Sequence, residues 1–225
     1  MTTFPVAGAS VGTLDPAKTT GVSGIGRAWW WVAAAAVLAA TLSLASWSVN
    51  RPKNFGVVEP GRVYRSGELT PSAMKKVVQA HGIKTVIDLG AYEAGSGEEA
   101  RARQTARALG VTRFVLRLEG DSTGNPNYYV QALRLINDPD RQPVLVHCAA
   151  GAQRTSCLIL LQRHIVEGRE YGTVFNEARR HRHDPGNNPY VLLMLAQWTE
   201  KIARAYREGG LIPGVDSVPD PVANP

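Results

Sequence analysis

Cysteine is the scarcest residue of this sequence: the 225 residues include only Cys148 and Cys157. Two cysteines this close together cannot build a disulfide framework, and neither belongs to the paired Cys or Cys/His spacing of a zinc site. We therefore expect no structural metal. The sequence also lacks internal repeats and a Gly-Lys-Ser/Thr phosphate loop, which excludes repeat architectures and nucleotide binding of the P-loop kind.

Acidic residues are fewer than basic ones, 19 against 25, so the chain carries a formal charge of +6. A basic balance suits a phosphate-bearing partner but does not distinguish a phosphoprotein from a phospholipid or a nucleic acid. We expect no nucleic-acid partner. The length and the 44% hydrophobic content allow one domain of ordinary size with flanking segments.

Charge is absent from residues 29–49. As a helix rising about 1.5 Å per residue, this stretch would cover about 31 Å, the thickness of a bilayer core. Tryptophans stand near both ends and basic residues lie just outside, as at membrane interfaces. We expect a single-pass transmembrane helix. A cleaved signal peptide and a buried helix of a soluble domain are the alternatives, and the flanking charges favour a cytoplasmic C-terminal part only slightly.

The rest of the chain divides by composition. Residues 1–28 are rich in Gly, Ala, Ser and Thr, and residues 208–225 are rich in proline without a core-forming pattern. We expect both segments to be disordered. Residues 54–207 carry the folding signals and form the expected domain.

Helix and strand signals alternate within residues 54–207. Helix starts and stops are marked by residues such as Thr70, Ser96, Gly82 and Gly110. We expect a pair of strands within residues 54–67 and further strands at 84–89, 113–118 and 144–146. The expected helices are 71–81, 97–109, 126–136, 155–166, a helix that ends at residues 179–183, and 189–206. This order predicts an α/β fold with a central, largely parallel sheet flanked by helices.

Residues 144–155 form the most informative stretch. Three branched apolar residues predict a buried strand, and small residues then lead into the apolar start of a helix. A strand, a tight loop and a helix N-terminus can hold an anion with backbone N–H groups and the helix dipole. Such a loop favours the thiolate form of Cys148, which would then be nucleophilic. Arg154 offers a planar fork for two oxygens of a phosphate.

These residues resemble the signature loop of the cysteine-dependent protein tyrosine and dual-specificity phosphatases. The resemblance lies in His147-Cys148, the five residues after them and Arg154-Thr155. It implies that Cys148 attacks phosphorus, Arg154 binds the phosphoryl group, Thr155 assists departure of the thiolate and His147 helps to hold it. The loop residues that would bind phosphate together with Arg154 are Ala149, Ala150, Gly151, Ala152 and Gln153.

A second match to this family lies upstream, where Tyr64-Arg65-Ser66 resembles the first segment of small dual-specificity phosphatases. The resemblance implies that residues 54–207 are the phosphatase domain. We expect no cofactor, because Arg154 and the loop amides supply the positive field that a metal would give. For Arg65 itself we favour a surface position or a structural ion pair.

The catalytic acid is expected on the Gly-flanked loop after residue 118. A carboxyl group there could move over the phosphate and protonate the leaving oxygen. We favour Asp121, with Glu119 or a purely turn-forming Asp121 as alternatives. Asp88 ends a strand, and the resemblance implies a structural role for it.

Three further expectations concern function. The substrate would be a phosphorylated protein or a small phosphoester, since the loop has no lysine that would suit highly phosphorylated inositides. A binding module without turnover, a phosphoinositide phosphatase, and sulfur or arsenate chemistry on a similar loop are the alternatives. We expect Cys157 to be a small buried residue, with a protective disulfide to Cys148 as the alternative. The cations and histidines of residues 179–183 are expected to form a solvated helix end, with lipid or substrate contact as the alternative.

Overall fold

The computed structural model describes residues 25–49, 51–219 and 223–224, without the side chains of residues 25–28, 44–49 and 223–224. The chain divides into two compact units at Ser46/Trp47. The expected disorder of residues 1–28 falls outside the described residues as far as residue 24, and residues 25–28 belong to a helix instead.

The described part of the first unit is helix α1 (Ile25–Val49), whose last three residues belong to the second unit. Its described side chains are all exposed, and Trp29, Trp30 and Trp31 are 70–79% accessible. Within the part of the chain that the structure describes, no helix is both long enough and apolar enough to cross a membrane. The side chains of residues 44–49, which belong to the predicted transmembrane segment, lie outside that part.

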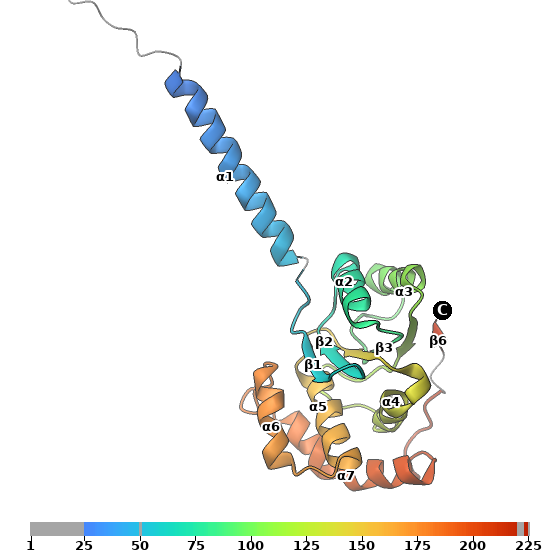
Figure 1. The fold of residues 1–225 in the computed structure, drawn as a ribbon. Helices are drawn as coiled ribbons and strands as arrows, with labels where there is room; N and C mark the ends of the chain where they lie inside the picture. The colour runs from blue at the N-terminus through green and yellow to red at the C-terminus, as the bar shows by residue number, and fades with distance from the viewer. Residues whose placement is uncertain (1–24, 50, 220–222, 225) are drawn as a thin grey trace, which may run out of the picture. The chain divides into compact units, whose positions relative to one another are not determined.

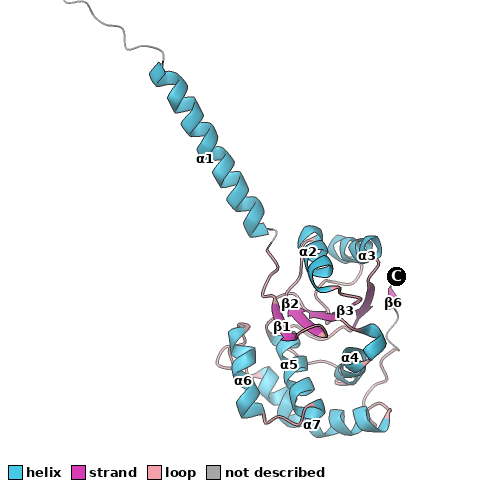
Figure 2. Cartoon of the chain, in the orientation of Figure 1, coloured by secondary structure: helices cyan, strands magenta, loops and turns pink. Residues whose placement is uncertain are grey.

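A six-stranded sheet organises the second unit, in the order β1-β2-β5-β3-β4-β6. The bounds are β1 Gly56–Glu59, β2 Val63–Ser66, β3 Thr85–Asp88, β4 Thr112–Val115, β5 Val144–His147 and β6 Ala223–Asn224. The four central strands run parallel, and β1 and β6 pair antiparallel at the two edges. The predicted α/β fold with a largely parallel sheet is confirmed, and Figure 2 shows the sheet between two groups of helices.

Helices cover both faces of the sheet (Figure 1). One face carries α2 (Pro71–His81) and α3 (Gly97–Leu109), and the other carries α4 (Asn127–Asn137), α5 (Gln153–Leu161), α6 (Tyr171–Arg180) and α7 (Tyr190–Glu208). Each face buries its own apolar cluster, the larger one under α4, α5 and α7. This arrangement leaves the carboxyl ends of the parallel strands free to form a site, as is usual for such folds.

The local helix signals act as the sequence predicts. Thr70 Oγ1 accepts the Ala73 N–H at the start of α2, and Ser96 Oγ accepts the Glu99 N–H at the start of α3. Gly82 and Gly110 end these helices in the left-handed conformation. The helix expected over residues 155–166 differs, because α5 gives way at Gln162 to one wider turn that ends at Val166.

The expectation of a disordered tail over residues 208–225 needs correction. Its described part packs along α4, with Ile212 only 4% exposed and its N–H donating to Asn127 Oδ1 at 2.8 Å. Farther along, the side chains of Asn125 and Gln131 donate to the carbonyls of Asp216 and Pro219. The described part of the tail is held in place because amide side chains of the domain bond its backbone groups, although its sequence has no core-forming period.

Candidate active site

The candidate site lies at the carboxyl end of β5, between β2 and β3. In the sheet register His147 is paired with Ser66 on one side and with Asp88 on the other. The chain leaves β5 at Cys148 and turns into α5 over residues 148–154, which we call the signature loop. The sheet therefore places the nucleophile candidate at its centre.

Cys148 is 1% exposed, and two donors reach its sulfur. The Gly151 N–H and the Thr155 hydroxyl each lie 3.2 Å from Sγ. Both contacts stabilise negative charge on sulfur, which is the form of cysteine that acts as a nucleophile. The structure thus brings together Cys148, Gly151 and Thr155 as the sequence predicts.

The carbonyls of the signature loop are bound from outside. The Ala149 carbonyl accepts from the Glu68 N–H at 3.1 Å, and the carbonyls of Ala150 and Gly151 accept from the Asn54 side chain at 3.3 and 2.9 Å. Because the N–H and C=O of a trans peptide point in opposite directions, the following N–H groups point away from these donors. The Gly151 N–H, which reaches the sulfur, agrees with this orientation.

The backbone conformation at position 151 requires glycine. Its φ is +70°, and a Cβ at this position would lie 2.4 Å from the Gly67 nitrogen and 2.6 Å from the Ser66 carbonyl carbon and oxygen. Side chains rarely adopt such a φ, and the neighbouring atoms are backbone atoms that cannot change rotamer. The loop therefore touches the end of β2 without an intervening side chain.

Arg154 is 8% exposed and is oriented by the main chain. Its Nη1 donates to the Leu89 carbonyl at 3.0 Å, to the Gly90 carbonyl and, at 3.4 Å, to the Leu118 carbonyl. Its Nε is buried and has no partner among the described residues. One edge of the guanidinium is thus fixed, while Nε stays available to an anion.

His147 belongs to a buried polar row with Asp88 and Arg113. Asp88 Oδ2 lies 2.5 Å from Arg113 Nη2 and 3.7 Å from His147 Nε2, and its Oδ1 accepts the Ala91 N–H. Burial lowers the pKa of His147 although Asp88 opposes this, so the imidazole is neutral at pH 7. Burial would raise the pKa of Asp88, but His147, Arg113 and the Ala91 N–H together lower it. These contacts hold Asp88 within the fold, which agrees with the structural role that the resemblance implies.

Sequence reasoning missed the residues that hold the signature loop. Arg65 is fully buried, and its Nη2 donates to the Gly151 carbonyl at 2.9 Å and to Ser156 Oγ at 2.8 Å. Burial lowers its pKa to about 10. We expected a surface position or a structural ion pair. The surface position was wrong, and the structural role is filled by hydrogen bonds, because the small residues of the loop leave room for a guanidinium beneath them. Only the resemblance around Tyr64-Arg65-Ser66 could have indicated this contact.

The cluster at residues 179–183 is also more than a solvated helix end. Arg179 and Arg180 are exposed, but His183 is 2% exposed and its Nδ1 lies 2.5 Å from Gln153 Oε1. His181 is half-buried beside Asn54, and burial lowers its pKa to about 4. The two histidines therefore support the signature loop from the end of α6.

The loop after β4 carries both acid candidates. It is connected to the site by the contact between the Leu118 carbonyl and Arg154 Nη1. Asp121 Oδ1 accepts the N–H and the hydroxyl of Thr123 at 2.9 and 2.6 Å, and Glu119 is exposed. In this structure Asp121 therefore stabilises its own turn.

Cys157 is completely buried in α5, and burial raises the pKa of its thiol to about 12. A thiol with this pKa is inert at neutral pH. Within the described residues no three His, Cys, Asp or Glu side chains are grouped so that they could hold a metal ion.

Comparison with known proteins agrees with this geometry. A curated inositol diphosphatase, DSP4 of Arabidopsis thaliana, is 29% identical over 118 residues, which are 51% of this chain and 57% of that protein. The chain thus spans little more than half the length of this relative.

Solved structures share the fold. The core catalytic domain of the PP-IP phosphatase SIW14 from S. cerevisiae, in complex with citrate, matches with a TM-score of 0.55 and 22% identity, over 72% of this chain and 97% of that one. TpbA from P. aeruginosa matches with a TM-score of 0.56 and 19% identity, over 69% and 91%.

The family model described as "DSP-PTPase phosphatase fused to NAD+ Kinase" matches residues 46–188, well over half of the 225 residues. This range contains β1 to β5, the signature loop and the loop of Asp121. The chain therefore belongs to this family, within the cysteine-dependent dual-specificity and tyrosine phosphatases, which are phosphoric monoester hydrolases.

Proposed function

We propose that this chain hydrolyses phosphomonoesters through a cysteinyl-phosphate intermediate. The observation that carries the proposal is the buried sulfur of Cys148 with two donors at 3.2 Å, in the same loop as an arginine whose Nε is unpartnered. Sulfur attacks phosphorus, the bond from phosphorus to the leaving oxygen breaks, and that oxygen takes a proton. Water then attacks phosphorus, and the S–P bond breaks while the Thr155 hydroxyl donates to the departing thiolate.

Asp121 is the proposed acid in the first step and base in the second. Its support is its place on a loop that contacts Arg154 through the Leu118 carbonyl. To reach a bound phosphate, its carboxyl group has to leave the Thr123 N–H and hydroxyl. Breaking two hydrogen bonds within one turn costs about 1–3 kcal/mol, which substrate binding can supply.

The test is a kinetic comparison of three variants on a small aryl phosphate. Cys148→Ser should abolish turnover, and Asp121→Asn should lower kcat by about 10²–10⁴-fold, as for loss of a general acid, while Glu119→Gln stays near wild type. A chelator should have no effect. Turnover by the serine variant would refute the proposed nucleophile, and an inactive Glu119→Gln with an active Asp121→Asn would move the acid to Glu119.

For the substrate we propose phosphotyrosine or phosphoserine/threonine of proteins. Support comes from the signature loop, which has no lysine. A second candidate is an inositol diphosphate, because the Arabidopsis relative is an inositol diphosphatase and SIW14 is a PP-IP phosphatase. A panel of phosphopeptides, phosphoinositides and inositol diphosphates decides between them by kcat/KM. Binding of phosphopeptide without release of phosphate would instead indicate a binding module.

We also propose that residues 29–49 attach the chain to a membrane, with the catalytic part on the cytoplasmic side. Support comes from the lack of charge in this stretch and from the exposed apolar side chains of its described part. Carbonate extraction of membranes from expressing cells tests the attachment. Recovery of the full chain in the carbonate-soluble fraction would refute it, and protease accessibility of residues 51–225 in sealed vesicles reports the side.

A further inference from the structure

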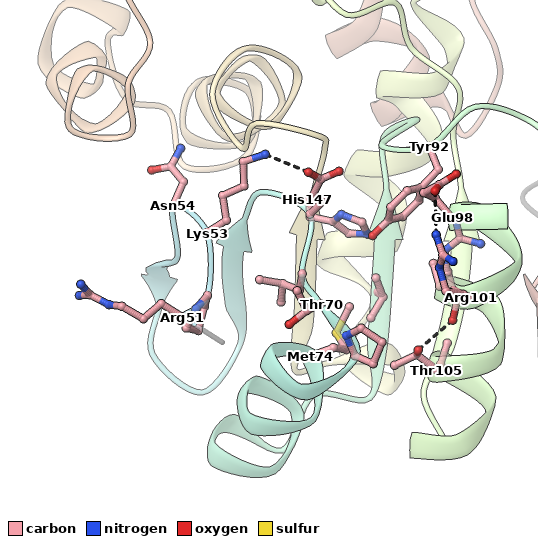
Figure 3. A pocket seen from close by; sticks show the side chains of 18 of the residues that line it. Arg51, Lys53, Asn54, Thr70, Met74, Tyr92, Glu98, Arg101, Thr105 and His147 are labelled. Carbon is pink, nitrogen blue, oxygen red and sulfur yellow. Dashed lines mark hydrogen bonds and ion pairs between the residues drawn. The ribbon is translucent and has the colours of Figure 1, made fainter. Parts of the chain in front are cut away.

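A cavity of about 760 Å³ lies beside the signature loop, on the face of the sheet that α2 and α3 cover. Its volume is within the range of small-molecule sites. Figure 3 shows Lys53 and Asn54 on one side of it, Tyr92, Glu98 and Arg101 on the other, and His147 between them. The mechanism above does not use this space.

The cavity is separate from the nucleophile. None of residues 148–155, all of which are described, lines it. It meets the signature loop through Asn54 and Glu68, which bind loop carbonyls, and through His147, which precedes Cys148. Since the carbonyls face this side, the cavity lies behind the loop and a phosphate on the N–H side leaves it free.

Positive charge predominates in its walls, which contain five Arg or Lys residues and two Glu residues. Both glutamates are paired already, Glu68 with Lys53 at 3.0 Å and Glu98 with Arg101 at 2.7 Å. The buried Asp88 pairs with Arg113 in the same way, which leaves a formal charge of +2 around the cavity. An anion entering the cavity therefore meets a small excess of cations, including the exposed Arg182.

Buried donors add a second, independent indication of an anionic ligand. Arg113 is 2% exposed, and its Nε and Nη1 have no partner among the described residues, because only Nη2 binds Asp88. His147 Nδ1 is likewise buried and unpartnered. Tyr92 adds a phenol whose pKa burial raises to about 12, so it remains a donor. Buried polar groups normally have partners, so this wall is suited to an acceptor.

Part of the cavity lining is apolar. It consists of side chains from α2, α3, β3 and the segment before α2: Leu69, Met74, Val86, Ala102 and Ala106. The two alanines keep the space open above the strand. A ligand with one flat apolar part would bury surface here without losing hydrogen bonds to water.

We propose that this cavity binds an organic anion, a carboxylate or phosphate on a flat apolar body, while the signature loop holds a phosphate of its own. The cations and buried donors take the charged group, and the wall with the two alanines takes the apolar body. The site does not depend on turnover and can be measured in the Cys148→Ser chain as well.

The test is calorimetric titration of the full chain with 2-naphthoate, with tungstate present to occupy the signature loop. Ala102→Trp fills the cavity and should weaken binding at least about tenfold, since the ligand loses its space. Ala108→Trp, on the exposed face of the same helix, is the matched control and should leave binding within about twofold. Absence of binding to the wild-type chain, or equal binding by both variants, would overturn the proposal.

A second pair of measurements tests the charge. Lys53→Gln combined with Arg182→Gln should weaken the binding of 2-naphthoate by about fivefold to tenfold, as expected for the loss of two partly screened cations. The neutral 2-naphthamide should bind more weakly than 2-naphthoate and be insensitive to these changes. Equal affinity for acid and amide would show that the cavity does not select anions. This comparison of acid and amide also tests the proposed anion site if the Ala102→Trp variant does not fold.

Discussion

At the scale of single residues, the site depends on side chains in which some polar atoms bind the protein and others remain available to the substrate. Arg154 uses Nη1 on three main-chain carbonyls, and its Nε has no partner in the described part of the chain. Its position is therefore set before a phosphate arrives, so that little side-chain entropy remains to be lost on binding. Thr155 differs, because its only described side-chain contact is with the sulfur of Cys148.

Thr155→Val should slow breakdown of the cysteinyl-phosphate, since the variant keeps the shape but lacks the hydroxyl that donates to Sγ. We expect kcat to fall by about 10–100-fold, and Thr155→Ser to stay within a few-fold of wild type. Stopped-flow release of the aryl alcohol should show a burst in the valine variant. Equal kcat for the valine and serine variants would contradict the assigned role.

Asn54 should matter for catalysis although it does not touch the phosphate. Asn54→Gly tolerates the φ of +48° but removes the donor to the carbonyls of Ala150, Gly151 and His181. We expect kcat to fall about tenfold, because the loop loses about 1–1.5 kcal/mol of hydrogen-bond stabilisation. Asn54→Asp should be worse, because a carboxylate repels these carbonyls. An aspartate variant as active as wild type would exclude this contribution.

The nucleophile, the arginine and the small loop residues could be predicted because they are consecutive and their types reveal their chemistry. The supports Asn54, Arg65 and His183 could not. Each acts on a loop residue 30 to 97 positions away, and no local pattern marks such a contact. The role of Asp121 is also not predictable, since a carboxyl that stabilises a turn and one that moves to a phosphate occur in the same kind of loop.

At the scale of elements, the helices with side-chain caps were predictable and the tail was not. Thr70 and Ser96 act on N–H groups three residues ahead, so the sequence contains both partners. The tail instead receives hydrogen bonds from α4 and from Asn125, two residues before it, and its few apolar residues have no period. The tail is held by tertiary contacts, which cannot be predicted from its amino-acid composition.

Ile212→Ala should destabilise the domain markedly, although it lies in the Pro-rich tail. A 4% exposed isoleucine that packs in the main core loses about 2–5 kcal/mol of unfolding free energy when truncated. Leu211→Ala is the control, since Leu211 is 36% exposed and should cost less than about 1 kcal/mol. Urea unfolding of both variants measures the difference, and equal midpoints would mean that the tail does not contribute to the core.

At the scale of the whole molecule, burial keeps three histidines neutral around the signature loop. The pKa values of His147, His181 and His183 are all lowered, first of all by burial. His147 directly precedes the signature loop, and His181 and His183 support it. Protonation would therefore place positive charge where the fold has buried a neutral ring.

The domain should therefore lose stability as the pH falls from about 6.5 to about 4. In this window the unfolded chain binds protons that the native histidines do not, so the free energy of unfolding decreases with falling pH. The lowered pKa of Asp88 adds a further loss below its ordinary value of 3.8. Urea midpoints at pH 7.5, 5.5 and 4.5 measure the trend. His181→Asn should make it less steep, and a midpoint that does not change with pH would contradict the prediction.

The architecture of the whole domain followed from the alternation of helices and strands, whereas the cavity behind the loop did not. Its walls come from residues 51–54, 68–71, 74, 86, 92, 98, 101, 102, 105, 106, 113, 147 and 182. Most of these residues are ordinary surface or core types. Only the sheet register brings Arg113 and His147 to the same wall.

The contact of Gly151 with the end of β2 has a consequence for how this sequence can diverge. Two segments separated by more than eighty positions meet backbone to backbone, with no side chain between them to absorb a shift. A mutation that displaces either segment by a few tenths of an ångström must be matched by a change in the other. Ser66 and Gly67 are thus constrained as tightly as a catalytic residue, although they supply no atom to the reaction.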